Sequence, residues 1–152
     1  MKKPALVVDI DGTLALRTER SWFDFDRVGE DVPNWPVANL LKDMHRYHNV
    51  ISGTDIALIA VSGRPATCYV ETEAWLERYH IPHHMLLMRD PKWVDSSGNM
   101  LPDWYVKERI YDEVIDPDYE VMFVVDDRPS VCRMWRRRGL PVFQVGDPDV
   151  EF

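Results

Sequence analysis

The sequence predicts an α/β protein with a parallel sheet of about five strands and helices on both faces. Short apolar segments rich in valine and isoleucine alternate with segments whose apolar residues recur every three or four positions. Strands that alternate with helices in this way form parallel sheets. The strand segments are apolar almost throughout, which is typical of a sheet buried on both faces.

The same patterns give approximate bounds for each element. Strands are predicted at Ala5–Asp9, Ile56–Val61, Met85–Met88, Val121–Val125 and Val142–Val145. Helices are predicted at Pro36–His48, Ala66–His80, Trp104–Ile115 and Pro129–Arg138. Two of these helices begin with a proline, which the first helical turn tolerates, and a glycine directly follows the last one.

The domain organisation follows from length and from what lies between the elements. At 152 residues the chain can form one domain with its own core, and no repeat or Gly/Ser linker divides it. We therefore expect a single domain over residues 1–152. Two irregular stretches, at about 14–35 and 89–103, each follow the carboxyl end of a strand. Open α/β sheets bind ligands at that edge, so these insertions are expected to border the site.

Composition excludes some classes of function. The net charge of −8 argues against sequence-blind binding of nucleic acid over the whole surface. Arginines do cluster at 128–138. This cluster is either a solvated helix face or a local contact for nucleic acid. No apolar run approaches the roughly 18 residues of a membrane span. Cys68 and Cys132 are far apart and form no CxxC pair, as expected of reduced thiols in a cytoplasmic protein.

The first chemical signal is a pair of carboxylates after the first strand. Asp9 and Asp11 are two positions apart and run into a Gly-Thr turn, so both side chains face one side of the strand. Two carboxylates in one site repel each other unless a cation or a shared proton compensates, which favours a divalent metal. A purely structural Asx turn is the alternative. A calcium loop is excluded because Leu14 and Arg20 replace its glycine and glutamate.

The second signal is Ser62-Gly63-Arg64 at the end of the next long strand. A serine hydroxyl and neighbouring backbone N–H groups at a strand-to-helix turn can bind phosphate oxygens. The guanidinium of Arg64 adds a fork of donors suited to the same ligand. Ser-Gly is also a common turn pair, so this motif is weak when taken alone.

Two further signals follow in the second half of the chain. Lys107 stands near the start of a predicted helix, four residues after Asp103, where a surface ion pair is the alternative interpretation. Asp126 and Asp127 end an apolar strand. One such aspartate could simply cap the next helix, but two together at this sheet edge favour metal ligation.

Taken in order, these four motifs resemble those of the haloacid dehalogenase (HAD) superfamily of aspartate-nucleophile phosphatases. More of the sequence is similar to the 3′-phosphatase domain of phage-type polynucleotide kinase/phosphatase, from Asp-Ile-Asp-Gly-Thr-Leu-Ala through Val-Asp-Asp-Arg-Pro-Ser-Val to Phe143–Asp147. Arg20, Arg64 and Asp103 match functional positions of that family. The resemblance implies a Rossmann-like HAD fold with a minimal cap.

The resemblance also implies a division of roles. Asp9 would be the nucleophile that becomes an aspartyl-phosphate, and Asp11 the general acid and base. Mg²⁺ would be held by the Asp9 carboxylate, the Asp11 main-chain carbonyl, and Asp126 or Asp127. Ser62, Gly63 and Lys107 are expected to bind the phosphoryl group or neutralise its charge. Arg20 and Arg64 are expected to contact the substrate. Asp103 would either contact the substrate or orient Lys107.

The expected substrate is a 3′-phosphorylated DNA or RNA end, in nucleic-acid repair. Free nucleotides or small phosphorylated metabolites are the enzyme alternative, and a fold-retaining binding module is the non-enzyme alternative. The insertions are too short for a large cap, which favours an open site. Because no Gly-x-x-x-x-Gly-Lys-Ser/Thr motif occurs, a kinase or ligase would be a separate partner. The start at Met1 favours a complete small protein over an excised domain, and host cytoplasm is expected if a phage encodes it.

Overall fold

The centre of the sheet is the first strand of the chain. The computed structural model describes residues 1–152. In it β1 (Lys3–Asp9) pairs with β4 (Ala57–Pro65) on one side and with β6 (Tyr119–Asp126) on the other. β5 (Met85–Arg89) and β7 (Val142–Gln144) form the edges, in the order β5-β4-β1-β6-β7 with every pair parallel. The predicted five-stranded parallel sheet is confirmed.

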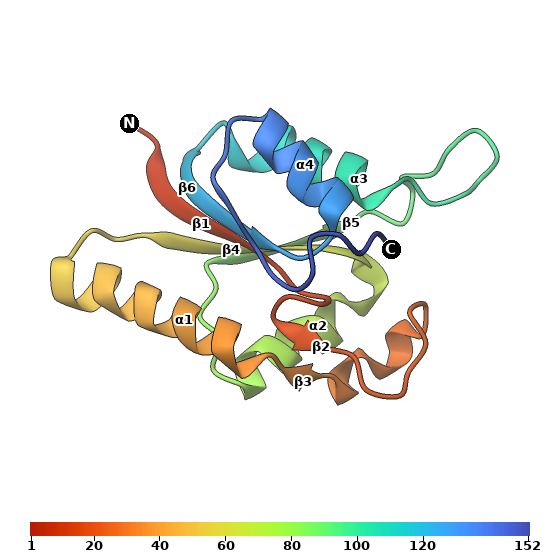
Figure 1. Cartoon of the computed structure of the whole chain (residues 1–152), viewed down its shortest axis with the longest axis horizontal. Helices are drawn as coiled ribbons and strands as arrows, with labels where there is room; N and C mark the ends of the chain where they lie inside the picture. Colours follow the sequence, from red (N-terminus) through yellow and green to blue (C-terminus); the bar gives the residue numbers. More distant parts are fainter.

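Helices cover both faces of this sheet, as predicted. Figure 1 shows α1 (Trp35–Arg46) and α2 (Tyr69–Arg78) below the sheet. It shows α3 (Asp103–Ile110) and α4 (Pro129–Arg137) above the sheet. The strands thus lie in the middle of three layers, which explains why they are apolar on both sides.

The alternation of side chains along each strand divides the interior into two cores. On β1, Ala5 and Val7 pack into the core that contains α3 and α4, whereas Val8 packs into the core that contains α1 and α2. On β4, Ile59 belongs to the first core and Leu58 to the second. This period of two fixes which side chains can reach the carboxyl end of the sheet on each face.

Three helices differ at their ends from the predicted bounds. π-helical turns at Tyr47–Ser52 and Tyr111–Ile115 extend α1 and α3. A 3₁₀ turn at Ala66–Cys68 precedes α2, which begins three residues later than predicted. Such terminal turns retain a helical hydrophobic spacing, so the sequence pattern cannot separate them from the helix.

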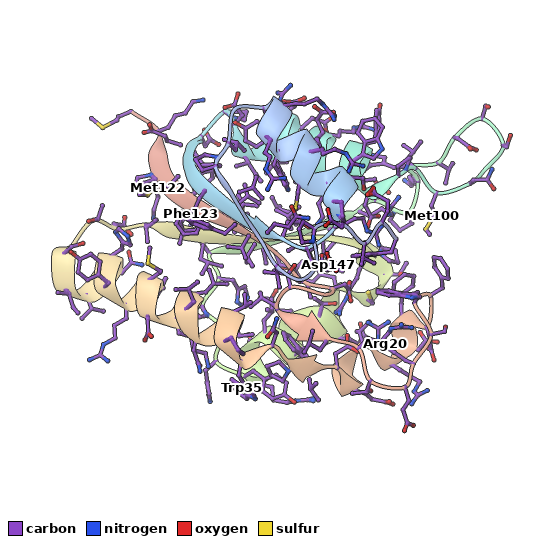
Figure 2. The ribbon with its side chains drawn as sticks, viewed as in Figure 1. Arg20, Trp35, Met100, Met122, Phe123 and Asp147 are labelled. Atoms are coloured by element: carbon purple, nitrogen blue, oxygen red, sulfur yellow. The ribbon has the colours of Figure 1, made fainter.

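The first insertion contains more structure than its irregular sequence indicated. Residues Ala15–Leu16 (β2) and Val32–Pro33 (β3) pair as a two-stranded antiparallel ribbon. A 3₁₀ turn at Phe25–Glu30 lies between them. Figure 2 places Arg20, from this insertion, and Met100, from the second insertion, at the same end of the molecule on opposite sides of the sheet. The insertions therefore flank the carboxyl edge of the sheet.

Two simpler expectations concern cysteines and membrane spans. Cys68 and Cys132 are both free and buried. Burial raises the pKa of the Cys132 thiol to about 12.

None of the helices has the length and apolar character needed to cross a bilayer.

The packing of α1 on the sheet can be tested with two neighbouring leucines. Leu41 is fully buried against the sheet, whereas Leu40 is half exposed on the other side of the same helix. We expect Leu41→Ala to lower the free energy of unfolding by about 2–5 kcal/mol because it leaves a cavity. Leu40→Ala, the matched control, should change it by less than about 1 kcal/mol. Urea denaturation followed by circular dichroism measures both; similar losses would contradict this packing.

Candidate active site

Three carboxylates meet at the carboxyl end of the two central strands. Asp9 ends β1 and Asp126 ends β6, its neighbour, and Asp127 follows directly. Oxygen atoms of the three side chains lie within 4.8 Å of one another. Thr13 donates a hydrogen bond to Asp9 Oδ2 at 2.8 Å, so the turn after β1 fixes that carboxylate. The structure brings together the acidic residues that the sequence marked separately.

Lys107 supplies the cation of this cluster. It reaches down from α3 and its ammonium lies 2.6 Å from Asp9 Oδ1 and 2.8 Å from Asp126 Oδ2. Burial by itself would lower the pKa of Lys107, but the charges of Asp126 and Asp9 outweigh it and raise that pKa. Lys107 therefore stays protonated, and it is a buried charge rather than half of a surface ion pair.

One ammonium does not balance three carboxylates. Burial, together with the charges of Asp126 and Asp127, raises the pKa of Asp9 well above its usual value in spite of Lys107. The pKa of Asp127 is raised mainly by burial and by Asp126. Clustered carboxylate oxygens with an excess of negative charge are the donors that a hard divalent cation prefers. The residues present therefore fit a Mg²⁺-type ion.

Asp126 and Asp127 face different surroundings. Asp126 Oδ1 accepts the main-chain N–H of Asp127, and its Oδ2 accepts both Lys107 and the Trp135 indole N–H. Asp127 instead lines the pocket beside Asp9. A methyl group on Gly12 would lie 2.0 Å from Asp127 Oδ2, so only glycine leaves room for this carboxylate at that turn.

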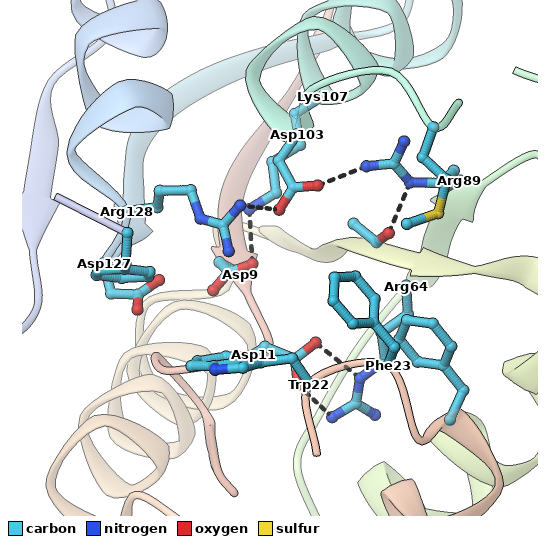
Figure 3. Close-up of a pocket in the computed structure, with 14 residues that line it drawn as sticks. Asp9, Asp11, Trp22, Phe23, Arg64, Arg89, Asp103, Lys107, Asp127 and Arg128 are labelled. Atoms are coloured by element: carbon cyan, nitrogen blue, oxygen red, sulfur yellow. Dashed lines mark hydrogen bonds and ion pairs between the residues drawn. The ribbon is translucent and has the colours of Figure 1, made fainter. Parts of the chain in front are cut away.

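Asp11 lies in a second, separate ionic network. Arg64 binds its carboxylate in a bidentate manner, with Nε and Nη2 each 2.8 Å from an oxygen, and Arg20 Nη2 is 3.1 Å away. Burial raises the pKa of Asp11, but the hydrogen bond and charge of Arg64 with the charge of Arg20 lower it overall. Asp11 is therefore a carboxylate held by two guanidinium groups, of which Figure 3 shows that of Arg64.

Asp31 links those two arginines and was missed by the sequence analysis. Its Oδ2 lies 2.7 Å from Arg20 and 2.8 Å from Arg64, and its main-chain carbonyl accepts the indole N–H of Trp75. Asp31 and both guanidinium groups are almost completely buried. These contacts place Arg20 and Arg64 around Asp11, with most of their donors already occupied.

Asp103 also has different partners from those expected. It makes no hydrogen bond with Lys107; its carboxylate lies 2.5 Å from Arg89 and 2.8 Å from Arg128. Asp103 therefore does not contact Lys107 directly, because two arginines hold it on the pocket wall, and its expected role stays a prediction. A methyl group on Gly63 would lie 2.7 Å from this carboxylate, so the wall requires glycine there. Arg89 was missed, although it directly follows a predicted strand.

Ser62 lies inside β4 and does not line the pocket. Its hydroxyl oxygen accepts the main-chain N–H of Arg64 at 3.1 Å, and the side chain is fully buried. Gly63 and Arg64 line the pocket directly. Ser62, Gly63 and Arg64 therefore lie inside β4, which continues to Pro65, and the strand-to-helix turn that the sequence indicated begins only after them.

One pocket of about 330 Å³ joins the two networks, and its lining includes Asp9, Asp11, Asp103, Lys107 and Asp127. Figure 3 shows Asp103 and Arg89 on one side of it and Trp22 and Phe23 on the other. Two other tryptophans, Trp93 and Trp104, pack against the core and do not line the pocket.

Two of the four arginines at residues 133–138 are paired with carboxylates. Arg133 pairs with Glu151, and Arg138 pairs with Asp112. Arg136 donates to the side-chain oxygen of Gln144. These contacts favour the interpretation of a solvated helix face over a continuous basic nucleic-acid surface.

Comparison with solved structures agrees with this fold. A chain in the structure of a Pnkp1/Rnl/Hen1 complex is 34% identical, with a TM-score of 0.82, over 98% of this chain and 48% of that one. The class C acid phosphatase from Bacillus anthracis shares the fold, with a TM-score of 0.59 at 20% identity, over 86% of this chain and 53% of its own. Fold and site together define a HAD-type phosphatase.

The particular family follows from the sequence comparison. Residues 3–150 match the model of the polynucleotide kinase PNKP phosphatase domain, and the chain belongs to that family. A protein of Autographa californica nuclear polyhedrosis virus described as a bifunctional polynucleotide kinase/RNA ligase is 35% identical over 151 residues. That match covers 97% of this chain and 20% of the viral protein, so the chain spans only a fraction of these relatives.

The charge imbalance at the acidic cluster predicts how a metal changes stability. Because burial raises the pKa of Asp127, the ionised side chain destabilises the metal-free protein at pH 7, above the usual pKa of aspartate. We expect Asp127→Asn to raise the melting temperature in EDTA and to remove most of the increase that Mg²⁺ produces in the wild type. Asp118→Asn, an exposed control, should leave both unchanged. Differential scanning calorimetry measures this; an undiminished Mg²⁺ effect in Asp127→Asn would contradict a role for Asp127 in binding.

Proposed function

We propose that this chain removes the 3′-phosphate from polynucleotide ends by a Mg²⁺-dependent reaction through an aspartyl-phosphate. The observation that carries the proposal is the separate handling of two carboxylates on one strand. Asp9 lies at the pocket beside Lys107, and Asp11 lies between two arginines. Carboxylates held in such different environments can take different roles in one reaction.

In the first step Asp9 would attack phosphorus in line with the leaving oxygen. Its two oxygens are oriented by Lys107 and Thr13, so the nucleophile needs little reorganisation. As the P–O bond breaks, the 3′-oxygen would take a proton from Asp11. The products of this half-reaction are a free 3′-hydroxyl, an Asp9 acyl-phosphate and an ionised Asp11.

In the second step Asp11 would remove a proton from water. The resulting hydroxide attacks phosphorus, the bond to Asp9 breaks, and inorganic phosphate leaves with both aspartates restored. The groups of this chain that can stabilise the phosphoryl group are the Lys107 ammonium and the main-chain N–H of Gly63. They would neutralise charge that develops on the phosphoryl oxygens.

The metal would be held by Asp9 and Asp127, with the main-chain carbonyl of Asp11 as a third ligand. Asp127 is favoured over Asp126 because it lines the pocket, whereas Asp126 accepts hydrogen bonds from Lys107, Trp135 and the main chain. When bound, Mg²⁺ supplies positive charge that offsets the carboxylate cluster and the phosphate. Asp126 would not bind the metal and would instead position the ammonium of Lys107.

The substrate class rests on the family and on the shape of the site. The relatives that match nearly the whole chain are named for polynucleotide kinase, RNA ligase and an RNA repair complex. The insertions that flank the pocket are short and leave it open, which suits the end of a long chain. By analogy with these relatives, we propose that a kinase and a ligase act together with this domain. The cytoplasmic location of the protein stays a prediction.

A comparison of substrates tests this proposal. With Mg²⁺, we expect phosphate release from 3′-phosphorylated RNA or DNA oligonucleotides with a kcat/KM at least about tenfold above that for a 3′-mononucleotide. A 5′-phosphorylated oligonucleotide should be inert, and EDTA should abolish release. Equal kcat/KM for mononucleotide and oligonucleotide would favour the alternative, a phosphatase of free nucleotides or small metabolites.

The covalent step has its own control. Asp9→Asn should lower kcat at least about a thousandfold. Rapid acid quenching of the wild type with ³²P-labelled substrate should trap a labelled protein that Asp9→Asn does not form. Undiminished turnover in this variant would exclude Asp9 as the nucleophile.

The environment of Asp11 predicts the pH dependence. Arg64 and Arg20 lower its pKa, so between pH 7 and 9 the free enzyme holds Asp11 ionised, and its protonated fraction falls tenfold per pH unit. Since the first step uses protonated Asp11, and bound Mg²⁺ would keep Asp9 ionised, kcat/KM for a 3′-phosphorylated oligonucleotide at saturating Mg²⁺ should fall about tenfold per pH unit over this range.

An aryl phosphate provides the comparison for this profile. Its leaving group needs no proton, so p-nitrophenyl phosphate should show a flatter profile and should survive Asp11→Asn better. Parallel profiles for both substrates would contradict the role of Asp11 as the acid.

A further inference from the structure

Aromatic side chains gather at the mouth of the pocket, beyond the groups that the proposed chemistry uses. Trp22, Phe23 and Phe152 all line it, and all three are exposed, Trp22 by 47% and Phe23 by 73%. Two of them come from the first insertion and the third from the segment after β7. Large aromatic side chains left open beside a charged site mark a binding surface rather than core packing.

Trp22 and Phe152 form a short stack with two arginines. The guanidinium of Arg17 lies 3.9 Å from the centroid of the Trp22 ring. The Phe152 ring is nearly parallel to Trp22, at 19° and 6.3 Å between centroids. The guanidinium of Arg128 lies 5.2 Å from the centroid of Phe152 and is also paired with Asp103 in the pocket wall. The stack therefore runs from the first insertion to the pocket wall.

We infer that Trp22 is a stacking platform for the nucleobase next to the 3′-phosphate, and that Phe152 occupies this platform until the base replaces it. The inference rests on the proposed function, since it assumes a nucleotide whose phosphate reaches Asp9. Phe152 shows that the platform accepts a nearly parallel aromatic ring. Bases stack on such side chains irrespective of their identity.

The chemistry around the platform suits a nucleotide better than a plain apolar ligand. Arg17 and Arg128 place two positive charges beside the aromatic rings of a chain whose net charge is −8. Cations beside a stacking surface match a ligand that joins aromatic bases to phosphates.

The segment that carries Phe152 is held by few contacts. Residues 145–152 form no helix or strand, and the side chain of Glu151 is fixed only by an exposed ion pair with Arg133. Exposed ion pairs contribute little to stability, so a base can displace Phe152 at small cost.

A double-mutant-type cycle tests this inference. It removes the base from the substrate and the Trp22 side chain from the protein, separately and together. The substrates are a 3′-phosphorylated oligonucleotide and the same oligonucleotide with a stable tetrahydrofuran abasic residue at its last position. In the wild type, we expect loss of the base to raise KM about tenfold. Trp22→Ala should raise KM for the base-bearing substrate by a similar factor and leave KM for the abasic one unchanged, because either change removes the same contact.

Two further variants make the result specific. Trp35→Ala removes a tryptophan of equal exposure, 48%, that also contacts a cation, Lys42, but lies on α1 and outside the pocket (Figure 2). It should leave both KM values unchanged. Phe152→Ala removes the occupant of the platform and should lower KM for the base-bearing substrate, opposite in sign to Trp22→Ala.

The outcomes separate this inference from the proposed function. If the wild type releases phosphate from neither oligonucleotide, the proposed function fails. If it hydrolyses both with equal KM, or if the base still contributes fully in Trp22→Ala, the function stands and the platform is wrong. A higher KM in Phe152→Ala would overturn the displacement of Phe152.

Discussion

The buried ion pairs of Lys107 with Asp9 and Asp126 are the interaction on which the rest of the site depends. Adjacent parallel strands end at one edge, so the β1–β6 pairing brings their terminal carboxylates together whatever their charge. Burying carboxylates without compensation costs several kcal/mol for each group. The Lys107 ammonium, at 2.6 Å and 2.8 Å from two of them, offsets part of this cost. Because Lys107 belongs to α3, the position of that helix is tied to the ends of both strands.

The second network shows how one strand can hold two carboxylates in different states. Asp9 is compensated from α3, on one face of the sheet, whereas Asp11 is compensated by Arg64 from β4 and Arg20 from the first insertion. Asp31 holds the two arginines together, so they do not repel each other within the site. Burial and the charges of Asp126 and Asp127 raise the pKa of Asp9 in spite of Lys107. Around Asp11 the two arginines outweigh burial and lower the pKa. The separation of roles proposed for the two groups has its physical origin in this arrangement.

Sequence analysis identified those site residues that stand directly after a predicted strand or near the start of a predicted helix. Asp9, Asp126 and Asp127 follow apolar strands, and Lys107 stands near a helix start, so an α/β pattern alone brings them to one edge. Asp31 has no such mark, because it lies inside an irregular insertion and acts only through contacts with distant arginines.

The partners of Asp103 show the same limit. Asp103 is four residues from Lys107 on one helix, yet its carboxylate binds Arg89 and Arg128 from other elements. Helical spacing brings two side chains near each other without fixing which of the surrounding charges they bind. The strands and helices were predictable because apolar periodicity is local, whereas the ionic networks depend on the assembled fold.

The distribution of charge constrains how an acidic protein could act on a polyanion. Two of the arginines on and after α4 that could have formed a basic surface are engaged by carboxylates, Arg133 by Glu151 and Arg138 by Asp112. Binding along a nucleic-acid backbone requires many unpaired cations, which this face does not offer. Contacts with the proposed substrate are therefore expected at the pocket itself, where Arg128 and the aromatic side chains of the mouth lie. A site built in this way suits recognition of a chain end, because the phosphate and its own nucleoside supply most of the contacts.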